Sequence, residues 1–428
     1  MRSASVYFKT SATSVAIIFL FVGMLQTAYL SKVLSRGHVH RQHIIKSVLG
    51  KKLYTSNFQL FSKSLLDLEL VDIYDRHVSF LSGPAKVDPI PQRFRTLLQI
   101  LELKSKNSKE ADFINIVPCP VAARKGINPF LIPIAENTVT KELLSFIRWP
   151  TQKANMDLQI VRASADGMLT LVSLGTDQYC HRLAVEMDFY GHPDAAAAIT
   201  LLNSVGEVPI NYKQGDFLPF LKSGKFPAIT PEDLRLVLDR YLLTKVGAFP
   251  DCYERLANDF FQKGNTVSAL VTCERASSVF YGWGHPMAFH SDMLQRLPDR
   301  DKEARDTARA SMSMPKWTLA PNKAGLQKAV ITAGFTDSSI LGDLHAFRAR
   351  DSREKDVAEG LSPIQVTLDQ AAHLMDAVAL GISNNFIKVD TEAGNVNYFN
   401  SWDDARTELA SKYRQGGYPD MADFILAV

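Results

Sequence analysis

The stretch that decides the fold is YERLANDFFQKGNTVSALVTCERA, residues 253–276. Its apolar residues recur at the three- and four-residue spacing of amphipathic helices. The pattern predicts two short helices joined by a tight turn. A helical hairpin of this kind buries one face and needs neighbours to cover it, so the rest of the chain must supply them.

The spacing of large and small residues in this stretch resembles a tetratricopeptide repeat, a pair of antiparallel helices that recurs about every 34 residues. Taking Tyr253 as the early aromatic residue, five later positions fit the pattern: Leu256, Ala257, Phe260, Ala269 and Ala276. Small residues at the crossing let the two backbones approach closely. Cys273 and Tyr281 depart from the family, which has a larger aromatic residue and a proline at those places.

A second unit of the same period is degenerate. Three of its positions match, namely Leu294, Ala310 and Pro315, and three do not, namely His290, Ser291 and Glu303. The resemblance therefore covers residues 249–315 only. Because a stable stack normally needs at least three hairpins, we expect the flanking helices at residues 230–246 and 322–350 to supply the missing layers.

The first flanking helix has clear end signals. In TPEDLRLVLDRYLLTKVG, residues 230–247, Thr230 is expected to cap the helix, Pro231 to occupy its first position and Gly247 to end it. The leucines, valine and tyrosine between them lie at helical spacing. Most of the chain after residue 215 is predicted to be helical in the same way.

The first 66 residues contain no acidic residue, since Asp67 is the first one in the chain. An 11-residue apolar run, VAIIFLFVGML at residues 15–25, has the length of a secretory signal core and is short for a membrane span. The basic, hydroxyl-rich segment at residues 31–66 has the composition of an organelle transit peptide. Together they resemble the bipartite leader by which algae with complex plastids import proteins through the endomembrane system.

That resemblance implies a plastid protein. Two alternatives stay open: a signal anchor with a basic juxtamembrane segment, and plain secretion or mitochondrial import. The weak cleavage pattern around residues 26–28 favours the anchor, and membrane contact is expected only through the leader if it is not removed.

Charge argues against a nucleic-acid partner. The leader holds nine of the 48 basic residues, which leaves 39 basic residues against 45 acidic ones and a formal charge of −6 for the remainder. Nucleic-acid affinity depends on an excess of Lys and Arg that releases counterions. An RNA-binding repeat protein would also need many consecutive units, so other proteins are the expected partners.

Four cysteines, Cys119, Cys180, Cys252 and Cys273, show no metal-knuckle or CxxC spacing. Free buried thiols in a reducing compartment are expected. No cofactor is expected, because the sequence contains no dinucleotide, phosphate-loop, serine-hydrolase or zinc-protease motif.

The clearest strand signal lies at residues 157–175, where DLQIVRAS and MLTLVSLG flank an Asp-Gly turn. A lone hairpin is marginal, so the following helix from Thr176 is expected to cover it. The result is a small α+β element at residues 155–205. Before it, residues 104–140 are predicted to be an irregular connector because of their prolines, and residues 140–148 a short helix that ends before Pro150.

The C-terminal region is predicted to hold a capped helix from Ser362, a β-hairpin at residues 385–400 and a closing helix from Ser401. Its last turn, residues 419–428, is expected to pack back onto the body. The predicted fold class is mainly α, with a repeat-like helical body, a small α+β element and short β-hairpins. The predicted boundaries are a leader at 1–66, N-terminal helices and connector at 67–150, the α+β element at 151–210, the repeat-like domain at 211–350 and a C-terminal region at 351–428.

The most distinctive composition is FYGWGHPMAFH, residues 280–290. We predict a partner-binding surface centred on Tyr281, Trp283, His285 and Phe289, with a tryptophan that only locks the turn as the alternative. The histidines here invite a metal hypothesis, but His285 and His290 are five residues apart and do not share a helical face, and a fourth ligand is missing. No metal site is predicted.

Two classes of function remain. The first is a plastid protein that docks on other proteins through a helical surface, for example in the assembly or maintenance of photosynthetic complexes. The second is an enzyme whose site is assembled from residues distant in sequence. For the enzyme, the candidates are Asp177 and His181, which share a helix face, although a surface ion pair at the start of a helix is the favoured interpretation. No catalytic residue is otherwise predicted, and the balance favours docking.

Overall fold

The computed structural model describes residues 55–107, 115–150, 158–204, 210–223, 231–335, 360, 363–380 and 401–428. The chain forms two compact units, Met1–Leu68 and Glu69–Val428, and the fold described below is that of the second. The predicted leader lies outside the described residues, except for its last part in helix α3 (Thr55–Ser82). The predicted hairpin at residues 385–400 also lies outside them.

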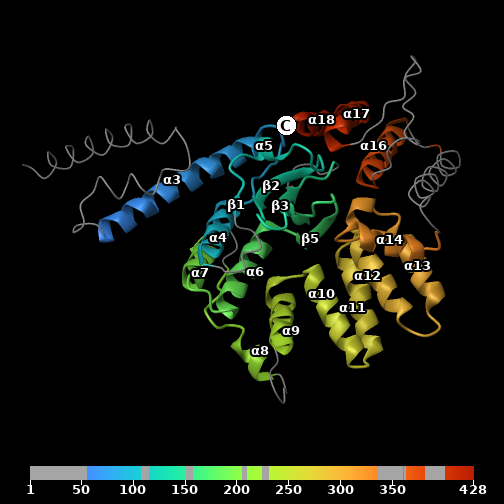
Figure 1. Ribbon diagram of the computed structural model, residues 1–428, viewed down its shortest axis with the longest axis horizontal. Coiled ribbons are helices and arrows are strands. Elements are labelled where there is room, and N and C mark those ends of the chain that lie inside the picture. The colour runs from blue at the N-terminus through green and yellow to red at the C-terminus, as the bar shows by residue number, and fades with distance from the viewer. Residues whose placement is uncertain are drawn as a thin grey trace, which may run out of the picture. The chain divides into compact units, whose positions relative to one another are not determined.

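A five-stranded antiparallel sheet lies at the centre of this unit (Figure 1). Its strands follow chain order: β1 (Asn115–Ile116), β2 (Leu131–Glu136), β3 (Leu143–Ile147), β4 (Gln159–Ala163) and β5 (Leu169–Ser173). The predicted hairpin is confirmed as β4 and β5. Gly167 in its turn has φ 84°, a backbone angle that glycine adopts without strain.

Two sequence predictions next to this hairpin are wrong. Residues 140–148 are not a helix, because Leu143–Ile147 forms β3 between β2 and β4. The connector at residues 104–140 is not irregular throughout, because it contains β1 and β2. Pro133 lies inside β2, and the ladder shifts register between Pro133 and Ala135. A bulge of this kind accommodates a residue that cannot donate a ladder hydrogen bond.

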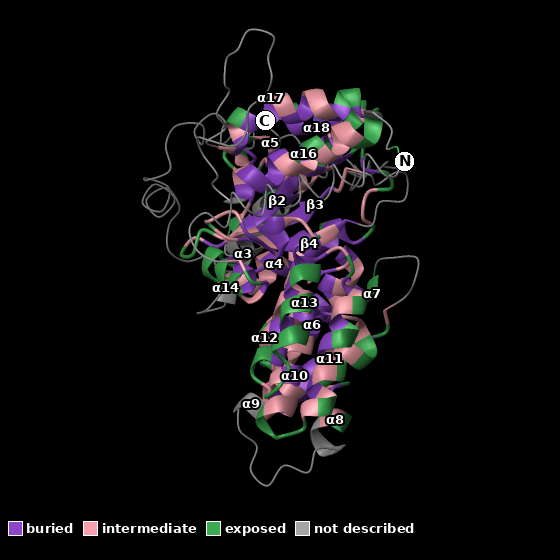
Figure 2. Cartoon of the chain, turned by 90° about the vertical axis from the view of Figure 1, so that its right-hand side faces the viewer, coloured by how far each residue is buried: buried purple, intermediate pink, exposed green. Residues whose placement is uncertain are grey.

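Helices cover the sheet and bury its apolar side chains. α4 (Phe94–Asn107), α6 (Thr176–Phe189) and α7 (Ala195–Ser204) pack together, and α6 contacts both β4 and β5, as the sequence predicts. The Phe94 and Phe146 rings meet edge to face with centroids 5.3 Å apart. Figure 2 shows that buried residues run through the sheet and the inner helix faces. The mainly α fold with a small α+β element is therefore confirmed.

A stack of helices follows the sheet (Figure 1). It begins with α9 (Pro231–Tyr241), which continues into a π-helical turn that ends at Gly247, and α8 (Leu218–Ser223) packs against it. The helical hairpin of residues 253–276 is confirmed as α10 (Pro250–Gln262) and α11 (Thr266–Val279), with Ala257, Ala269 and Ala276 buried between helices. The next layers are α12 (Gly284–Gln295), α13 (Asp301–Ser311) and α14 (Lys323–Thr332).

The degenerate second unit is also a helical hairpin. Ser291, which does not fit the repeat pattern, is buried where α12 meets α13, and its hydroxyl donates to the Ala304 carbonyl at 2.6 Å. A small side chain at this crossing serves the packing as alanine would. The assignment of these layers as tetratricopeptide units stays a prediction.

The C-terminal helices are α16 (Pro363–Leu380), α17 (Trp402–Gln415) and α18 (Pro419–Leu426). Ser401 caps α17 by accepting the Asp404 amide at 3.2 Å, as the sequence predicts. Buried Asp376 ties α16 to the segment before α14, because its carboxylate accepts the backbone N–H of Lys316 at 2.8 Å. All four cysteines are free, and Cys180, Cys252 and Cys273 are buried.

Two buried arginines hold the end of the chain against the sheet. Arg124 donates to the Leu131, Pro129 and Phe424 carbonyls at 3.0, 2.6 and 2.7 Å, and Arg406 donates to the Ile425 carbonyl at 2.8 Å. Burial lowers the pKa of Arg124 to about 9, with a further contribution from neighbouring Arg406 and Arg148. The expected return of the last turn to the body is therefore confirmed, and the C-terminal carbonyls of α18 bind the two cations.

Three tryptophans join the sheet to the helical stack. Trp149 at the end of β3 stacks on Trp317 with centroids 5.4 Å apart and meets Trp283 edge to face at 5.8 Å. Gln159 on β4 accepts the indole N–H of Trp149 at 3.0 Å and that of Trp283 at 3.1 Å. One amide oxygen therefore satisfies donors from both parts of the fold.

Replacing this acceptor should weaken the junction. Gln159→Leu removes one hydrogen bond from each indole N–H, and the loss of an acceptor by the buried Trp283 alone costs about 1–3 kcal/mol. Urea unfolding followed by tryptophan fluorescence measures the loss. Gln262→Leu, at an exposed position on α10, is the matched control, and an equal effect of both changes would contradict the role of Gln159.

A network of ion pairs joins α6, α9 and α10. Arg182 on α6 binds Asp251 on α10 through two hydrogen bonds of 2.8 and 2.6 Å, and Arg255 binds Asp239 of α9 through two of 2.7 and 2.8 Å. Glu186 accepts from Arg182 at 3.0 Å. The arginines hold the pKa values of Glu186 and Asp251 below their usual range despite burial. Bidentate pairing fixes the angle between the helices as well as their contact.

Asp239 is the most buried acid of this network. Asp239→Ala removes the bidentate carboxylate partner of Arg255, and breaking a buried pair in this way should cost about 3 kcal/mol. Asp306→Ala, at an exposed position on α13, should change the free energy of unfolding by less than about 0.5 kcal/mol. Chemical denaturation of the two variants separates these expectations.

Candidate functional site

A groove lies between α12 and α14, the first helices of two successive layers. Its volume is about 160 Å³. An open depression of about 310 Å³ adjoins it and shares Lys328 and Thr332 with it. The groove is lined mainly by small and apolar side chains, with a few polar groups among them: His285, Ala288, Phe289, Asp292, Leu319, Ala320, Pro321, Gly325, Lys328, Ala329 and Thr332.

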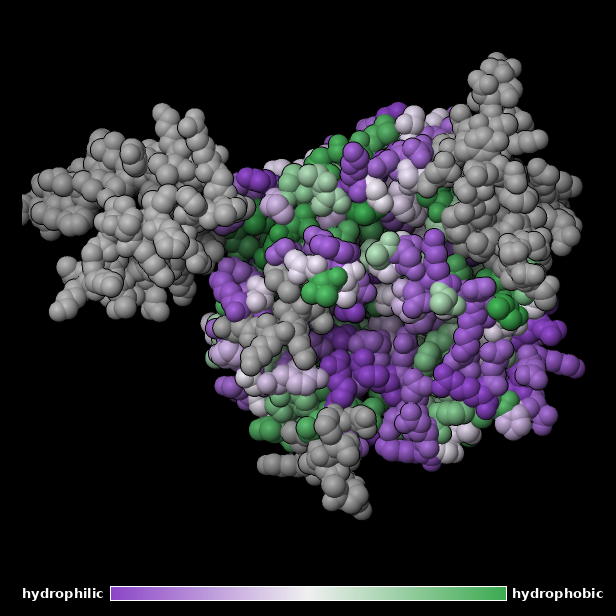
Figure 3. All heavy atoms as spheres, viewed as in Figure 1, coloured by the Kyte–Doolittle hydropathy of each residue, from purple (hydrophilic) through white to green (hydrophobic). Residues whose placement is uncertain are grey.

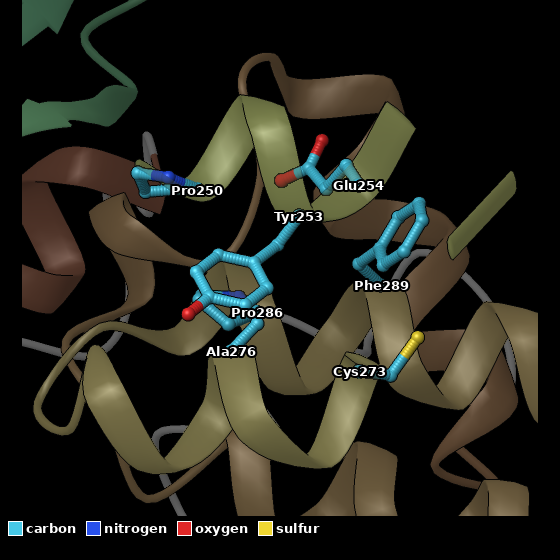
Figure 4. A pocket seen from close by; sticks show the side chains of 7 residues that line it. All are labelled: Pro250, Tyr253, Glu254, Cys273, Ala276, Pro286 and Phe289. Atoms are coloured by element: carbon cyan, nitrogen blue, oxygen red, sulfur yellow. The ribbon is translucent and has the colours of Figure 1, made fainter. Parts of the chain in front are cut away.

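The seam on the other side of α12 is closed. Side chains from α10, α11 and α12 converge there, and Figure 4 shows the Tyr253 ring beside Pro286 and Ala276, with Phe289 near Cys273. Phe289 lines both this seam and the open groove. The packed seam therefore sets the position of the groove wall.

His285 links three segments beside the groove. Its Nε2 lies 3.0 Å from Glu254 Oε1 on α10, and its Nδ1 lies 3.3 Å from the Leu319 carbonyl oxygen. Both ring nitrogens face acceptors, so the charged imidazolium, which donates from both, fits best. Burial opposes the charge, but Glu254 and the Leu319 carbonyl raise the pKa of His285 above its ordinary value.

Asp292 is the charged centre of the open end. Its carboxylate pairs with Lys328 of α14 and with Arg296, the residue that caps the end of α12. The two cations lower the pKa of Asp292, although its partial burial acts in the opposite direction. Lys328 and Arg296 side chains are 62% and 43% exposed, so both can reach a further partner.

The structure places the four predicted binding residues differently. His285 and Phe289 line the groove. Tyr281 is 79% exposed beyond the end of α11, and Trp283 is only 2% exposed because it belongs to the tryptophan junction, as the turn-locking alternative expects. A Cβ on Gly284 would lie 2.9 Å from Leu319 side-chain atoms, which explains the glycine beside this tryptophan. A binding role for the four residues stays a prediction.

Sequence reasoning did not find the α14 side of the groove. Gln327, Lys328 and Ile331 line the open depression, and Ile331 is 56% exposed. The sequence signal that could have indicated this side of the groove is Ile331, an apolar residue on the outer face of the short helix α14. The pairing of Lys328 with Asp292 spans 36 positions, which spacing within one helix does not show.

The enzyme candidates have separate partners. Asp177 pairs with buried Arg93, which precedes α4, and the His181 ring meets Tyr212 with centroids 5.7 Å apart. Burial, with the Arg93 charge, lowers the pKa of His181 to about 4. Within the described ranges, no three His, Cys, Asp or Glu side chains are grouped to hold a metal ion. Over the same ranges, no helix is long and apolar enough to cross a membrane.

Two family models match the chain. Residues 75–223 match the model described as PAB N-terminal, and residues 250–336 match the PAB middle domain. The chain is similar to PAB proteins. The first match runs from α3 to α8 and includes the sheet, whereas the second contains α10 to α14 and therefore the whole groove.

One similar protein spans most of the chain. It is Protein IN CHLOROPLAST ATPASE BIOGENESIS, chloroplastic, from Arabidopsis thaliana, which is 28% identical over 352 residues. The alignment covers 82% of this chain and 90% of that protein. No solved structure matches the chain.

The charged state of His285 should make stability depend on pH. Because its folded pKa is raised above the ordinary 6.5, its contribution is complete below pH 6.5 and is lost as the pH rises through the folded pKa. His285→Gln should reduce the fall in unfolding free energy between pH 6 and pH 8.5, measured in urea.

His290, on the same helix, is the matched control. Burial lowers the pKa of His290, so its neutral form is favoured and stability is lost as the pH falls below 6.5. His290→Gln should therefore change the pH profile in the opposite direction. Identical profiles for the two variants would contradict the assignment of a charged His285.

Proposed function

We propose that this protein is a plastid assembly factor that acts by docking on other proteins, and that it serves the biogenesis of the chloroplast ATPase. The observation that carries the proposal is the similarity to the Arabidopsis protein, which extends over 90% of that protein's length. A likeness of this extent includes the sheet, the junction and the helical stack, so it concerns the whole architecture and not one motif.

Plastid location has two independent supports. The similar protein is described as chloroplastic, and the acid-free leader of this chain combines a signal core with a transit-like segment. We further propose entry through the endomembrane system with removal of the leader, in preference to a membrane-anchored or secreted form.

The docking surface is proposed to be the open face of α12 and α14. Helical layers with small residues at their crossings, which resemble tetratricopeptide units, leave one flank of each helix uncovered. Here that flank carries a groove with an apolar floor and a charged end. Tyr281, at 79% exposure, extends the surface beyond α11. Figure 3 shows many hydrophilic residues over the lower part of the face that it presents.

Replacement of the Arabidopsis protein tests the proposal. The chain, carrying a plastid transit peptide, is expressed in Arabidopsis plants that lack the similar protein, and assembled chloroplast ATPase is measured on native gels. Restoration of the assembled complex is expected. Expression of the folded chain in the plastid without any rise in assembled ATPase would contradict the proposal.

A matched variant distinguishes docking from an enzymatic role. His181→Phe removes the imidazole that an enzyme at α6 would need while preserving an aromatic ring beside Tyr212. Under the docking proposal this variant restores assembly as well as the unchanged chain does. Loss of restoration with an intact fold would favour the enzyme.

A further inference from the structure

We infer that the groove between α12 and α14 binds a partner segment in which an apolar side chain is flanked by carboxylates. This inference rests on the proposed docking function and names the chemistry of its partner. It commits to a peptide segment of another protein and not to a nucleic acid, a metabolite or a second copy of this chain.

The charge balance of the groove argues for acidic flanks. His285 is compensated by Glu254, but Asp292 faces two cations, Lys328 and Arg296, so the group carries one uncompensated positive charge. Asp292 is the only carboxylate that lines either the groove or the adjoining depression among the described residues. The helix α14 contributes two lysines and no acid.

Lys328 and Arg296 retain donors for another anion, although Arg296 also donates to Asn258 at 3.3 Å. An ammonium has three donors and a guanidinium five, and a single carboxylate cannot use them all. Both side chains are substantially exposed, and exposed ion pairs contribute little stability, so they rearrange at low cost. A partner carboxylate would therefore find the Lys328 ammonium in the lining of the groove, with Arg296 paired to the same Asp292.

The floor and rim argue for an apolar side chain between the carboxylates. Small side chains leave room in the groove for a partner side chain: Ala288, Ala320, Pro321 and Ala329 line it. Phe289 forms one wall, and Ile331, at 56% exposure, stands on the rim of the adjoining depression. Burial of an exposed isoleucine against a partner is favourable by about 25 cal/mol for each Å² removed from water.

Amide side chains complete the recognition. Gln295 and Gln327 line the depression next to Ile331, and each amide can both donate and accept. These groups match the backbone N–H and C=O of an extended segment, which has no internal hydrogen bonds of its own. The same surface suits neither a base stack, because it exposes no free aromatic pair, nor a phosphate backbone, because its positive charge is small.

Short fluorescent peptides test the inference. One alternates leucine with glutamate, a second has lysine in place of each glutamate, and a third has serine in place of each leucine. Fluorescence polarisation with the full chain is measured at low and high salt, since screening weakens exposed charge contacts. The first peptide is expected to bind at least about tenfold more tightly than either of the others.

Variants locate the binding. Lys328→Glu and Ile331→Asp should each weaken the first peptide about tenfold, and Lys328→Glu should improve binding of the lysine peptide. Lys302→Glu, at an exposed position on α13, makes the same charge change outside the groove and should have no effect. Circular dichroism confirms that each variant is folded.

The outcomes separate this inference from the proposed function. Absence of binding, or binding that Lys328→Glu and Ile331→Asp leave unchanged, overturns the inference even if the chain restores ATPase assembly in plants. A dimer that Ile331→Asp dissociates assigns the groove to a second copy and also overturns it. Selective peptide binding without restoration of assembly overturns the proposed function alone.

Discussion

The amide oxygen of Gln159 is the contact on which the arrangement of this fold depends. It accepts from Trp149, which belongs to the sheet, and from Trp283, which begins α12. With Trp317 stacked on Trp149, the three indoles form an aromatic joint between β-structure and helices. Because the joint fixes the first turn of α12, it also fixes Phe289 and Asp292 two turns further on, and these residues form one side of the groove.

Ion pairs position the helical layers in addition to the aromatic joint. The ion pairs among α6, α9 and α10 hold the first layer of the stack to the helices over the sheet. His285 then connects α10 to α12 and to the segment before α14. Each layer is positioned by directional contacts as well as by apolar packing, so the groove walls are placed before any partner arrives.

The sequence predicted the elements whose signals are local. The α10 and α11 hairpin, the β4 and β5 hairpin with its Asp-Gly turn, and the Ser401 cap each depend on residues a few positions apart. β3 was missed because LLSFI is a short, continuously apolar run, whose period does not separate strand from helix. The segment is a strand because it pairs with β2 and β4, and this pairing depends on residues distant from it in sequence. Pro133 hid β2 for a similar reason, since the bulge that accommodates it depends on the neighbouring strand.

The candidate site could be predicted only in part. His285 and Phe289 were selected by their unusual local composition, but Lys328 and Ile331 become neighbours of α12 only through the stacking of layers. The sequence left two roles open for Trp283, because the same large aromatic side chain suits an exposed anchor and a buried joint, and the structure places it in the joint. Composition identifies such an aromatic residue, but only the fold determines whether its side chain is exposed or buried.

The clamp of Arg124 and Arg406 on α18 has a consequence for how the molecule is completed. Arg124 also donates to the Leu131 carbonyl at the start of β2 and meets the Phe424 carbonyl 300 positions along the chain, so the packing beside β2 is incomplete until α18 is present. When the chain emerges from a ribosome or a translocation pore with its N-terminus first, Arg124 lacks its acceptors on α18 until that helix has also emerged. Folding of this region therefore depends on α18, and a chain truncated before this helix would leave buried Arg124 and Arg406 without the carbonyl acceptors that α18 supplies.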